Sequence, residues 1–263
     1  MNIDGKVFLV TGAGSGIGRE LTVQLVAKGA KVAAIDIDLP ALEETLKLSG
    51  PHVDIFQIDI RDLEEVAKLP IKIESKFGRI DGLINNAGII QPFVRVNDLT
   101  LEQARKVMDV NFYGPLALIK SFLPHLLKQK EAHILNVSSM GAYAPVPGQS
   151  VYGASKAAIK LLTEGLRSEL TGTTVGVTIV FPGAIDTNIT KNSGIDIPVS
   201  TSDAPEFSMT SAKDAAAAMI RAIEKNSPRL CIGKDAKMMD LLSRLSPIFA
   251  AKLIYKQMAS LLK

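Results

Sequence analysis

The sequence is poor in the residues that disulfides, metal sites and nucleic-acid interfaces require. Its 263 residues include one cysteine, three histidines and no tryptophan. A lone Cys231 cannot form an internal disulfide, and no cluster of His and Cys has the spacing of a metal site. The 30 basic and 27 acidic residues are interspersed and leave a net charge of +3. We therefore expect no metal ion and no nucleic acid among the partners.

Long apolar segments are also missing. No run is long enough to span a bilayer, and the first residues lack the apolar core of a secretion signal, so we expect a cytoplasmic protein. Hydrophobic residues nevertheless make up 47% of the chain, which is enough to bury a full core. Single α/β domains often reach about 250 residues, so we expect one domain over residues 1–263.

Short runs rich in Val, Ile and Leu alternate with longer segments of helical period. This alternation predicts a doubly wound α/β fold, a seven-stranded parallel sheet with helices on both faces. Strands are expected at Lys6–Thr11, Lys31–Asp36, Val53–Ile58, Gly82–Asn85, His133–Val137, Val175–Phe181 and Arg229–Ile232. Helices are expected at Gly18–Lys28, Leu39–Leu48, Leu63–Phe77, Leu101–Leu127, Tyr152–Leu170 and Ala212–Glu224. Residues 188–210, rich in polar residues and proline, are expected to form a long substrate loop.

The first strand leads into a glycine-rich turn of the form T-G-x-x-x-G-x-G, from Thr11 to Gly18. Small residues there allow the backbone to approach a pyrophosphate at a helix N-terminus, although a structural tight turn has the same composition. The second strand favours a cofactor site because it ends in Asp36, which can accept hydrogen bonds from both adenosine ribose hydroxyls. An acidic side chain would repel a 2′-phosphate, and the next residue is Ile37 rather than a cation. We therefore predict NAD(H), with Arg19 in solvent or facing the sheet.

Two further strand ends are expected to contact the cofactor. Asp59 can meet the adenine amino group, with Ile60 beside the ring, although Asp59 can equally cap the helix that follows. The fourth strand leads into Asn85-Asn86-Ala87-Gly88, whose small residues permit close backbone approach but also suit an ordinary turn.

A tyrosine and a lysine four residues apart begin one of the helical segments. Tyr152 and Lys156 therefore lie on one helix face, about a turn apart. Free tyrosine titrates at about pH 10, so the lysine charge, a positive nicotinamide ring and the helix N-terminus must together favour phenolate near neutrality. Such a pair alone also suits an ordinary helix surface. Ser139, at the end of the fifth strand, favours catalysis because its hydroxyl can bind a substrate oxygen. A serine hydrolase is disfavoured because no histidine lies in these motifs.

Together these motifs resemble the short-chain dehydrogenase/reductase family, from Gly5 to about Gly233. The motifs that match in order and spacing are Thr11 to Gly18, Asn85 to Gly88, Asn111, Ser139, Tyr152, Lys156 and Pro182-Gly183. The resemblance implies a Rossmann fold, a homodimer or homotetramer, and hydride transfer between NAD and an alcohol or a ketone or aldehyde. Tyr152 then resembles the acid/base, Lys156 the residue that lowers its pKa and holds the nicotinamide ribose, and Ser139 the donor to the substrate oxygen.

The resemblance assigns further roles. Asn111 resembles the helix-kinking asparagine that holds a water near Lys156. Ser138 is the less suitable catalytic serine, because the family's spacing between serine and tyrosine points to Ser139, one residue later. The predicted catalytic residues are thus Asn111, Ser139, Tyr152 and Lys156. The predicted cofactor residues are Gly12, Ser15, Gly16, Ile17, Gly18, Asp36, Asp59, Ile60, Asn86, Ala87, Gly88, Tyr152, Lys156, Pro182, Ile185 and Thr187.

The substrate side is less specific. Candidate pocket residues are mostly apolar, and no cluster of Arg or Lys marks a phosphate group, so we expect a hydrophobic, steroid- or retinoid-like alcohol or ketone. The candidate pocket residues are Met140, Gly141, Tyr143, Gln149, Ile90 and Phe93. Residues 235–263 form an amphipathic basic segment interrupted at Pro247, for which a lid or subunit contact is favoured over weak membrane attachment.

Two alternative functions remain open. An NADPH-dependent ketoacyl-type reductase is opposed by Asp36 and by the lack of positive charge beside it. A non-catalytic NAD-binding sensor is opposed by the intact set of Ser139, Tyr152 and Lys156, because a sensor needs no proton-transfer groups.

Overall fold

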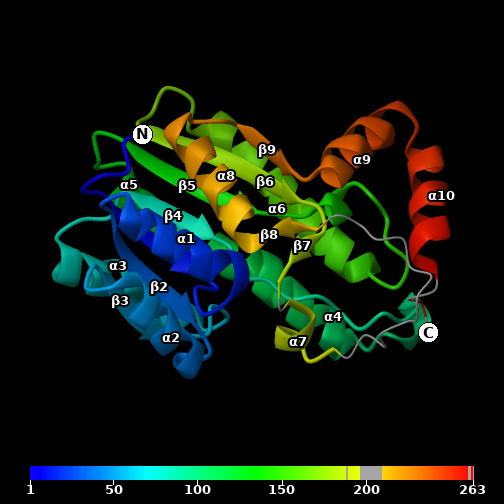
Figure 1. Cartoon of the computed structure of the whole chain (residues 1–263), viewed down its shortest axis with the longest axis horizontal. Helices are drawn as coiled ribbons and strands as arrows, with labels where there is room; N and C mark the ends of the chain where they lie inside the picture. The colour runs from blue at the N-terminus through cyan, green and yellow to red at the C-terminus, as the bar shows by residue number, and fades with distance from the viewer. Residues whose placement is uncertain (188, 196–208, 260–261, 263) are drawn as a thin grey trace.

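The main sheet of the protein is parallel throughout, as the alternating sequence pattern predicts. The computed structural model describes residues 1–187, 189–195, 209–259 and 262 (Figure 1). Within them, seven strands pair in the order β3-β2-β1-β4-β5-β6-β9. They are β1 (Val7–Thr11), β2 (Lys31–Asp36), β3 (Val53–Gln57), β4 (Gly82–Asn85), β5 (Ala132–Val137), β6 (Val175–Pro182) and β9 (Arg229–Ile232). The predicted doubly wound α/β fold is confirmed.

Helices cover both faces of this sheet, so its central strands are buried on both sides. On one face lie α1 (Gly16–Ala27), α2 (Leu39–Ser49) and α8 (Ala212–Glu224). On the other lie α3 (Leu63–Phe77), α5 (Gly114–Leu126) and α6 (Ser150–Glu169). Packing between β1 and β4 is tight: Phe8 stands opposite Gly82 in the register, and a β-carbon at Gly82 would overlap the Phe8 ring.

The helix predicted over Leu101–Leu127 is not one regular α-helix. Helix α4 (Leu101–Met108) is followed by a π-helical turn, Asp109–Tyr113, and then by α5. The reason lies at Asn111, whose amide binds the backbone of Ile89: Oδ1 accepts from its N–H at 2.9 Å and Nδ2 donates to its carbonyl at 2.9 Å. One extra residue in the turn points this side chain inward, as π-bulges at functional sites commonly do.

The chain after β6 forms two small units. Strands β7 (Ile185–Asp186) and β8 (Thr210–Ser211) pair in a second sheet that the sequence did not predict. In the predicted loop 188–210, Ile189–Asn192 form the helical turn α7, and residues 188 and 196–208 lie outside the described residues. The tail folds as two helices, α9 (Lys234–Leu245) and α10 (Pro247–Met258), interrupted at Pro247 as predicted. No described helix combines the length and apolarity needed to cross a bilayer.

The strand order reverses between β1 and β4. In open α/β sheets, ligands bind in the crevice outside the carboxyl ends of the strands at such a switch point. The strand ends that meet there carry Thr11, Asp36, Asn85, Val137 and Pro182. The fold therefore brings the predicted cofactor and catalytic segments to one edge of the sheet.

Candidate active site

The glycine turn after β1 lies against the segment that follows β4. Gly12 and Gly16 have φ angles of +67° and +51°, which side chains rarely adopt. A β-carbon on Gly12 would lie 3.0 Å from the Ala87 Cα, and one on Gly18 would overlap the Gly12 carbonyl oxygen. The Thr11 hydroxyl accepts from the backbone N–H groups of Asn86 and Ala87, each at 3.0 Å. Both predicted cofactor segments therefore form one surface of small residues and backbone.

Asp36 stands beside this turn, as its place at the end of β2 predicts. Its Oδ2 accepts from the Gly14 N–H at 2.9 Å, and its Oδ1 accepts from the Asp38 N–H at 3.2 Å. The side chain is partly exposed, and Ile37 next to it is 59% exposed. The carboxylate therefore borders the turn while remaining open to a ligand.

The prediction for Arg19 was wrong. Its guanidinium neither extends into solvent nor faces the sheet, but lies against the glycine turn and α2. It donates to the Gly14 carbonyl, to Thr45 Oγ1 at 3.1 Å and to Glu44 at 2.8 Å. Because Glu44 pairs with Arg19, the cation nearest to the turn is already neutralised.

Asp59 and Ile60 have their own partners. Arg61 Nε donates to both Asp59 oxygens, at 3.0 and 2.9 Å, and these hydrogen bonds hold the pKa of Asp59 below its usual value. The helix-cap alternative for Asp59 was wrong, because Asp62 caps α3 by accepting from the next N–H groups. Ile60 is 5% exposed and packs in the core, so only its backbone is available to a cofactor.

The segment after β6 lies over the same turn. Pro182 is buried at the end of β6, and Ile185 packs against the core together with Ile17. A β-carbon on Gly16 would lie 3.3 Å from Thr187, and Asn192 donates to the Ser15 hydroxyl at 2.8 Å. The predicted residues of this segment are therefore gathered around the glycine turn.

The predicted catalytic residues form a second cluster in the same crevice. A β-carbon on Gly141 would lie 3.4 Å from Cε1 of Tyr152 and 3.5 Å from Oγ of Ser139. Lys156 Nζ donates to the Val137 carbonyl at 3.1 Å and lies 5.9 Å from the centroid of the Tyr152 ring. The serine hydroxyl, phenol and ammonium therefore lie within a few ångströms of one another.

Gly88 connects this cluster to the cofactor segments. A β-carbon there would lie 3.0 Å from Lys156 Nζ and 3.2 Å from Asn111 Oδ1. Asn111 also donates to the Ser155 hydroxyl on α6 at 3.0 Å. Any larger residue than glycine would therefore displace the lysine or the asparagine.

The two adjacent serines have different surroundings. Ser138 is buried and donates to the main-chain carbonyl of Lys156 at 2.7 Å. Ser139 is partly exposed, accepts from the Gly141 N–H at 3.1 Å and lies with the Tyr152 ring beside Gly141. This geometry favours Ser139 over Ser138 as the serine that meets a substrate.

Burial dominates the protonation equilibria of the cluster. It raises the pKa of Tyr152, and the hydrogen bond with Ser139 opposes this shift. Burial also lowers the pKa of Lys156 to about 8. The lysine is therefore charged at neutral pH, but the surroundings within the chain hold the phenol protonated.

Gln91 is a structural neighbour of the site that the sequence did not indicate. Its Oε1 accepts from the N–H groups of Val151 and Tyr152, each at 2.9 Å, and its Nε2 donates to the Gly148 carbonyl at 2.9 Å. Gln149, the N-cap residue of α6, supplies no side-chain cap, so Gln91 caps the helix from another segment. A contact across 60 residues leaves no local signal.

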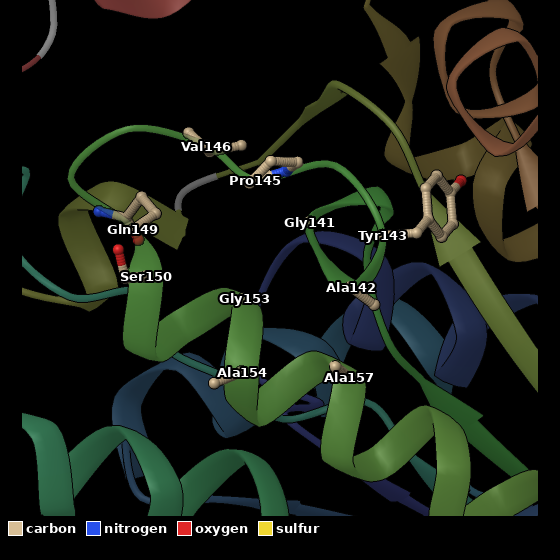
Figure 2. Close-up of a pocket in the computed structure, with 10 residues that line it drawn as sticks. All are labelled: Gly141, Ala142, Tyr143, Pro145, Val146, Gln149, Ser150, Gly153, Ala154 and Ala157. Atoms are coloured by element: carbon tan, nitrogen blue, oxygen red, sulfur yellow. The ribbon is translucent and has the colours of Figure 1, made fainter. Parts of the chain in front are cut away.

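The predicted substrate residues do not form one pocket. A hollow beside α6 measures about 350 Å³ and is lined by Gly141, Tyr143 and Gln149 but by neither Ser139 nor Tyr152 (Figure 2). Tyr143 points away from α6, donates to the Ala236 carbonyl at 2.9 Å and packs beneath the tail (Figure 2). Tyr143 therefore lines the hollow as predicted, while its hydroxyl is held by α9.

The other predicted pocket residues lie around the crevice. Met140 packs against the tail helices, and the Ile90 N–H donates to the Ser193 hydroxyl at 3.0 Å. Phe93 and Leu262 meet at Gly148, where a β-carbon would lie within 3.2 Å of both. The tail therefore reaches the loop that precedes the catalytic helix.

Comparison with known proteins identifies the family. The family described as short chain dehydrogenase matches residues 6–197. The chain belongs to this family. This short-chain dehydrogenase is 34% identical over 254 residues to the oxidoreductase SadH of Mycobacterium tuberculosis (strain ATCC 25618 / H37Rv), covering 93% of this chain and 92% of SadH. The predicted resemblance is confirmed, and family membership makes the chain an oxidoreductase of the kind that binds nicotinamide cofactors.

Solved structures of other short-chain dehydrogenases are also similar. One from Burkholderia phymatum, in complex with NAD, has a TM-score of 0.81 and 26% identity over 93% of this chain and 96% of that one. One from Burkholderia cenocepacia J2315, in complex with NADP, has a TM-score of 0.80 and 32% identity, and the match covers 97% of this chain and 99% of that one. The family therefore leaves open which nicotinamide cofactor a given member uses.

Proposed function

We propose that this short-chain dehydrogenase uses NAD(H) to interconvert a hydrophobic alcohol and the corresponding ketone or aldehyde. The observation that carries the proposal is that Ser139, Tyr152 and Lys156 share one crevice with the glycine turn. Hydride transfer requires a substrate carbon held between a proton-transfer group and a nicotinamide. The crevice contains both the proton-transfer residues and the glycine turn that would bind the nicotinamide cofactor.

The residues of the crevice fit a dinucleotide. The glycine turn opens α1 without an acidic residue in its first turn, so the positive end of the helix dipole is available to a pyrophosphate. Gly12, Gly16 and Gly88 leave room that a side chain would fill. Asp36 is placed to accept hydrogen bonds from ribose hydroxyls.

The side chains divide the chemical work. When bound, NAD supplies the hydride acceptor and, in its oxidised form, a positive ring. Tyr152 accepts the alcohol proton as the hydride leaves the carbon, and returns it in the opposite direction. Ser139 donates a hydrogen bond to the substrate oxygen, and the Lys156 charge, with that ring, offsets the burial that holds the phenol protonated.

Two observations favour NAD(H) over NADP(H). Asp36 borders the place where a 2′-phosphate would lie, and Arg19 already pairs with Glu44. Among the residues that the structure describes there, a dianionic phosphate would face a carboxylate and a cation that is already paired. The NADPH-dependent ketoacyl-type reductase therefore remains the less favoured alternative.

The same assignment extends to the assembly. We propose a homodimer or homotetramer, since α6 exposes Ala154 and also Leu161, which is 69% exposed. Exposed apolar residues in a row on one helix favour burial against a second subunit.

The test is a screen of secondary alcohols and ketones with NAD(H) and with NADP(H), following the absorbance of the reduced nicotinamide. We expect turnover of hydrophobic substrates, with a higher catalytic efficiency for NAD(H). A higher efficiency with NADP(H) would favour the reductase alternative. Tight NAD binding without turnover of any substrate would favour the non-catalytic sensor and overturn the proposal.

A further inference from the structure

Helices α9 and α10, which contact each other and which we call the C-terminal hairpin, expose a group of large apolar residues on their outer side. We call the tail surface the exposed residues Lys237, Met238, Leu241, Arg244, Leu245, Ile248, Phe249, Lys252, Tyr255 and Lys256. Leu245 is 74% exposed, Ile248 71% and Phe249 55%. Six of the sixteen exposed large apolar residues in the described part of the chain fall within residues 238–255, so they form a patch rather than a scatter.

The inner side of the same hairpin is packed. Met239, Ala250 and Ile254 are buried against Ala144, in a cluster separate from the core on either face of the sheet. This packing fixes which side of each helix faces outward. The hairpin stands at one end of the molecule, beyond the edge of the sheet (Figure 1). The tail surface is therefore held in place and accessible.

Helical spacing arranges the tail surface in two stripes. On α9, Met238, Leu241 and Leu245 follow one another at three and four residues and lie on one side. On α10, Ile248 and Tyr255 lie seven residues apart on one side, with Lys252 between them. Cations therefore border or interrupt each apolar stripe, as in helices that lie in a membrane interface.

The charge of the tail surface is positive. Helix α10 contains no acidic residue, and both acidic residues of α9 are engaged elsewhere. Asp235 accepts from the Ala184 N–H at 2.7 Å, and Asp240 pairs with Arg229 and Arg244. Among the residues that the structure describes, Lys237, Lys252 and Lys256 form no ion pair, so these three ammonium groups are available to an anionic partner.

We propose that the tail surface docks onto an anionic lipid bilayer, with the hairpin lying in the interface. An apolar stripe between cations matches acyl chains below anionic headgroups. A second copy of the chain fits less well, because a two-fold contact would bring the same lysines together. Lid and docking roles are compatible, since they use opposite sides of the hairpin. The proposal does not depend on the oxidoreductase activity.

The experiment is co-sedimentation of the full-length chain with vesicles, without cofactor or substrate. Vesicles of phosphatidylcholine with phosphatidylglycerol are compared with phosphatidylcholine alone. We expect binding to the anionic vesicles and a loss of roughly tenfold in affinity for Ile248→Ser/Phe249→Ser. We expect a loss of similar size for Lys252→Glu/Lys256→Glu, and weaker binding at high salt.

Matched controls separate docking from general surface effects. Ile71 on α3 is 70% exposed, so Ile71→Ser removes the same side chain as Ile248→Ser at the same exposure. Lys47→Glu makes one such charge reversal, half of that in the double lysine variant, on α2 and far from the tail in the chain. Both controls are expected to bind vesicles like the unaltered protein, and circular dichroism verifies that all variants are folded.

Three outcomes would overturn the proposal. They are no binding to anionic vesicles, equal losses in the control variants, and a fall in oligomer mass of the vesicle-free Ile248→Ser/Phe249→Ser variant. The last result would assign the tail surface to a contact between copies of the chain. Failure of the alcohol and ketone screen would leave these measurements unaffected.

Discussion

Tyr152 depends on its neighbours for both its position and its protonation state. Gln91 binds its backbone N–H, Ser139 lies beside its ring at Gly141, and Lys156 lies one helical turn further along α6. Burial raises the pKa of the phenol, so nearby positive charge such as that of Lys156 has to offset this effect before the phenolate can form. A change in any neighbour should therefore alter the reactivity of this tyrosine.

Removal of the phenol oxygen is the most direct test of this role. Tyr152→Phe should lower kcat by roughly 10²- to 10⁴-fold, because a general acid/base contributes that much. The NAD dissociation constant, measured by fluorescence titration, should stay within about twofold. Tyr255→Phe, a change at a tyrosine that is 59% exposed, is the control. A fully active Tyr152→Phe enzyme would refute the assignment.

Asp36 is the residue expected to select the cofactor. Asp36→Ala should raise KM for NAD by about tenfold to a hundredfold, since hydrogen bonds to a charged group contribute about 1.5–3 kcal/mol. The preference for NAD over NADP should fall with it, because the carboxylate no longer repels a 2′-phosphate. Steady-state kinetics with both cofactors measures the ratio, and Asp38→Ala removes the same charge two residues away. An unchanged ratio in Asp36→Ala would contradict the proposal.

At the scale of elements, strand positions could be predicted and the interruption of a helix could not. The expected strand Lys31–Asp36 has the bounds of β2, because its run of buried apolar residues is flanked by polar residues at both ends. The π-helical turn at Asp109–Tyr113 has no such signal, since one extra residue hardly alters an apolar pattern of helical period. Family resemblance, not periodicity, indicated Asn111.

The π-helical turn gives a prediction about stability and activity together. Asn111→Ala removes three hydrogen bonds and leaves the N–H and carbonyl of Ile89 without their partner. The free energy of unfolding should fall by about 2–4 kcal/mol, measured by urea titration. Turnover should also fall, because Lys156 Nζ lies close to Asn111 across Gly88. Asn97→Ala, at an exposed asparagine, should change neither quantity.

At the scale of the whole molecule, a buried histidine couples folding to pH. His133 lies in β5, an internal strand of the sheet, with its Nε2 2.8 Å from the Thr178 hydroxyl, and burial lowers its pKa to about 3. In the unfolded chain the His133 imidazole binds a proton below about pH 6.5, whereas in the folded chain this imidazole stays neutral until the pH is much lower. The stability that this difference supplies is complete above pH 6.5 and is lost as the pH falls towards 3.

Urea unfolding at a series of pH values checks this coupling. Between pH 7 and pH 5 the unaltered protein should lose about 2 kcal/mol through His133. His133→Gln should lack this part of the pH dependence, whatever its stability at pH 7, and His52→Gln at an exposed histidine should retain it. Parallel pH profiles for the His133→Gln and unaltered proteins would contradict the prediction.

Contacts between distant segments also limited what the sequence could predict. The glycine turn, Asp36 and the Tyr152 helix carry local patterns, so their positions at the crevice followed from the order of the strands. Gln91 supports α6 from a segment about sixty residues away, and Tyr143 packs under α9, about ninety residues later. Local sequence spacing predicts neither contact, because tertiary packing alone brings these segments together.

The fit of Phe8 against Gly82 has a consequence for how such chains diverge. The ring occupies the space that a β-carbon at position 82 would need, so these two positions cannot change independently. A lineage could acquire alanine at position 82 only after the aromatic ring at position 8 had been replaced by something smaller. Among homologues, the two positions should therefore covary, with glycine beside the aromatic residue and larger residues beside a small one.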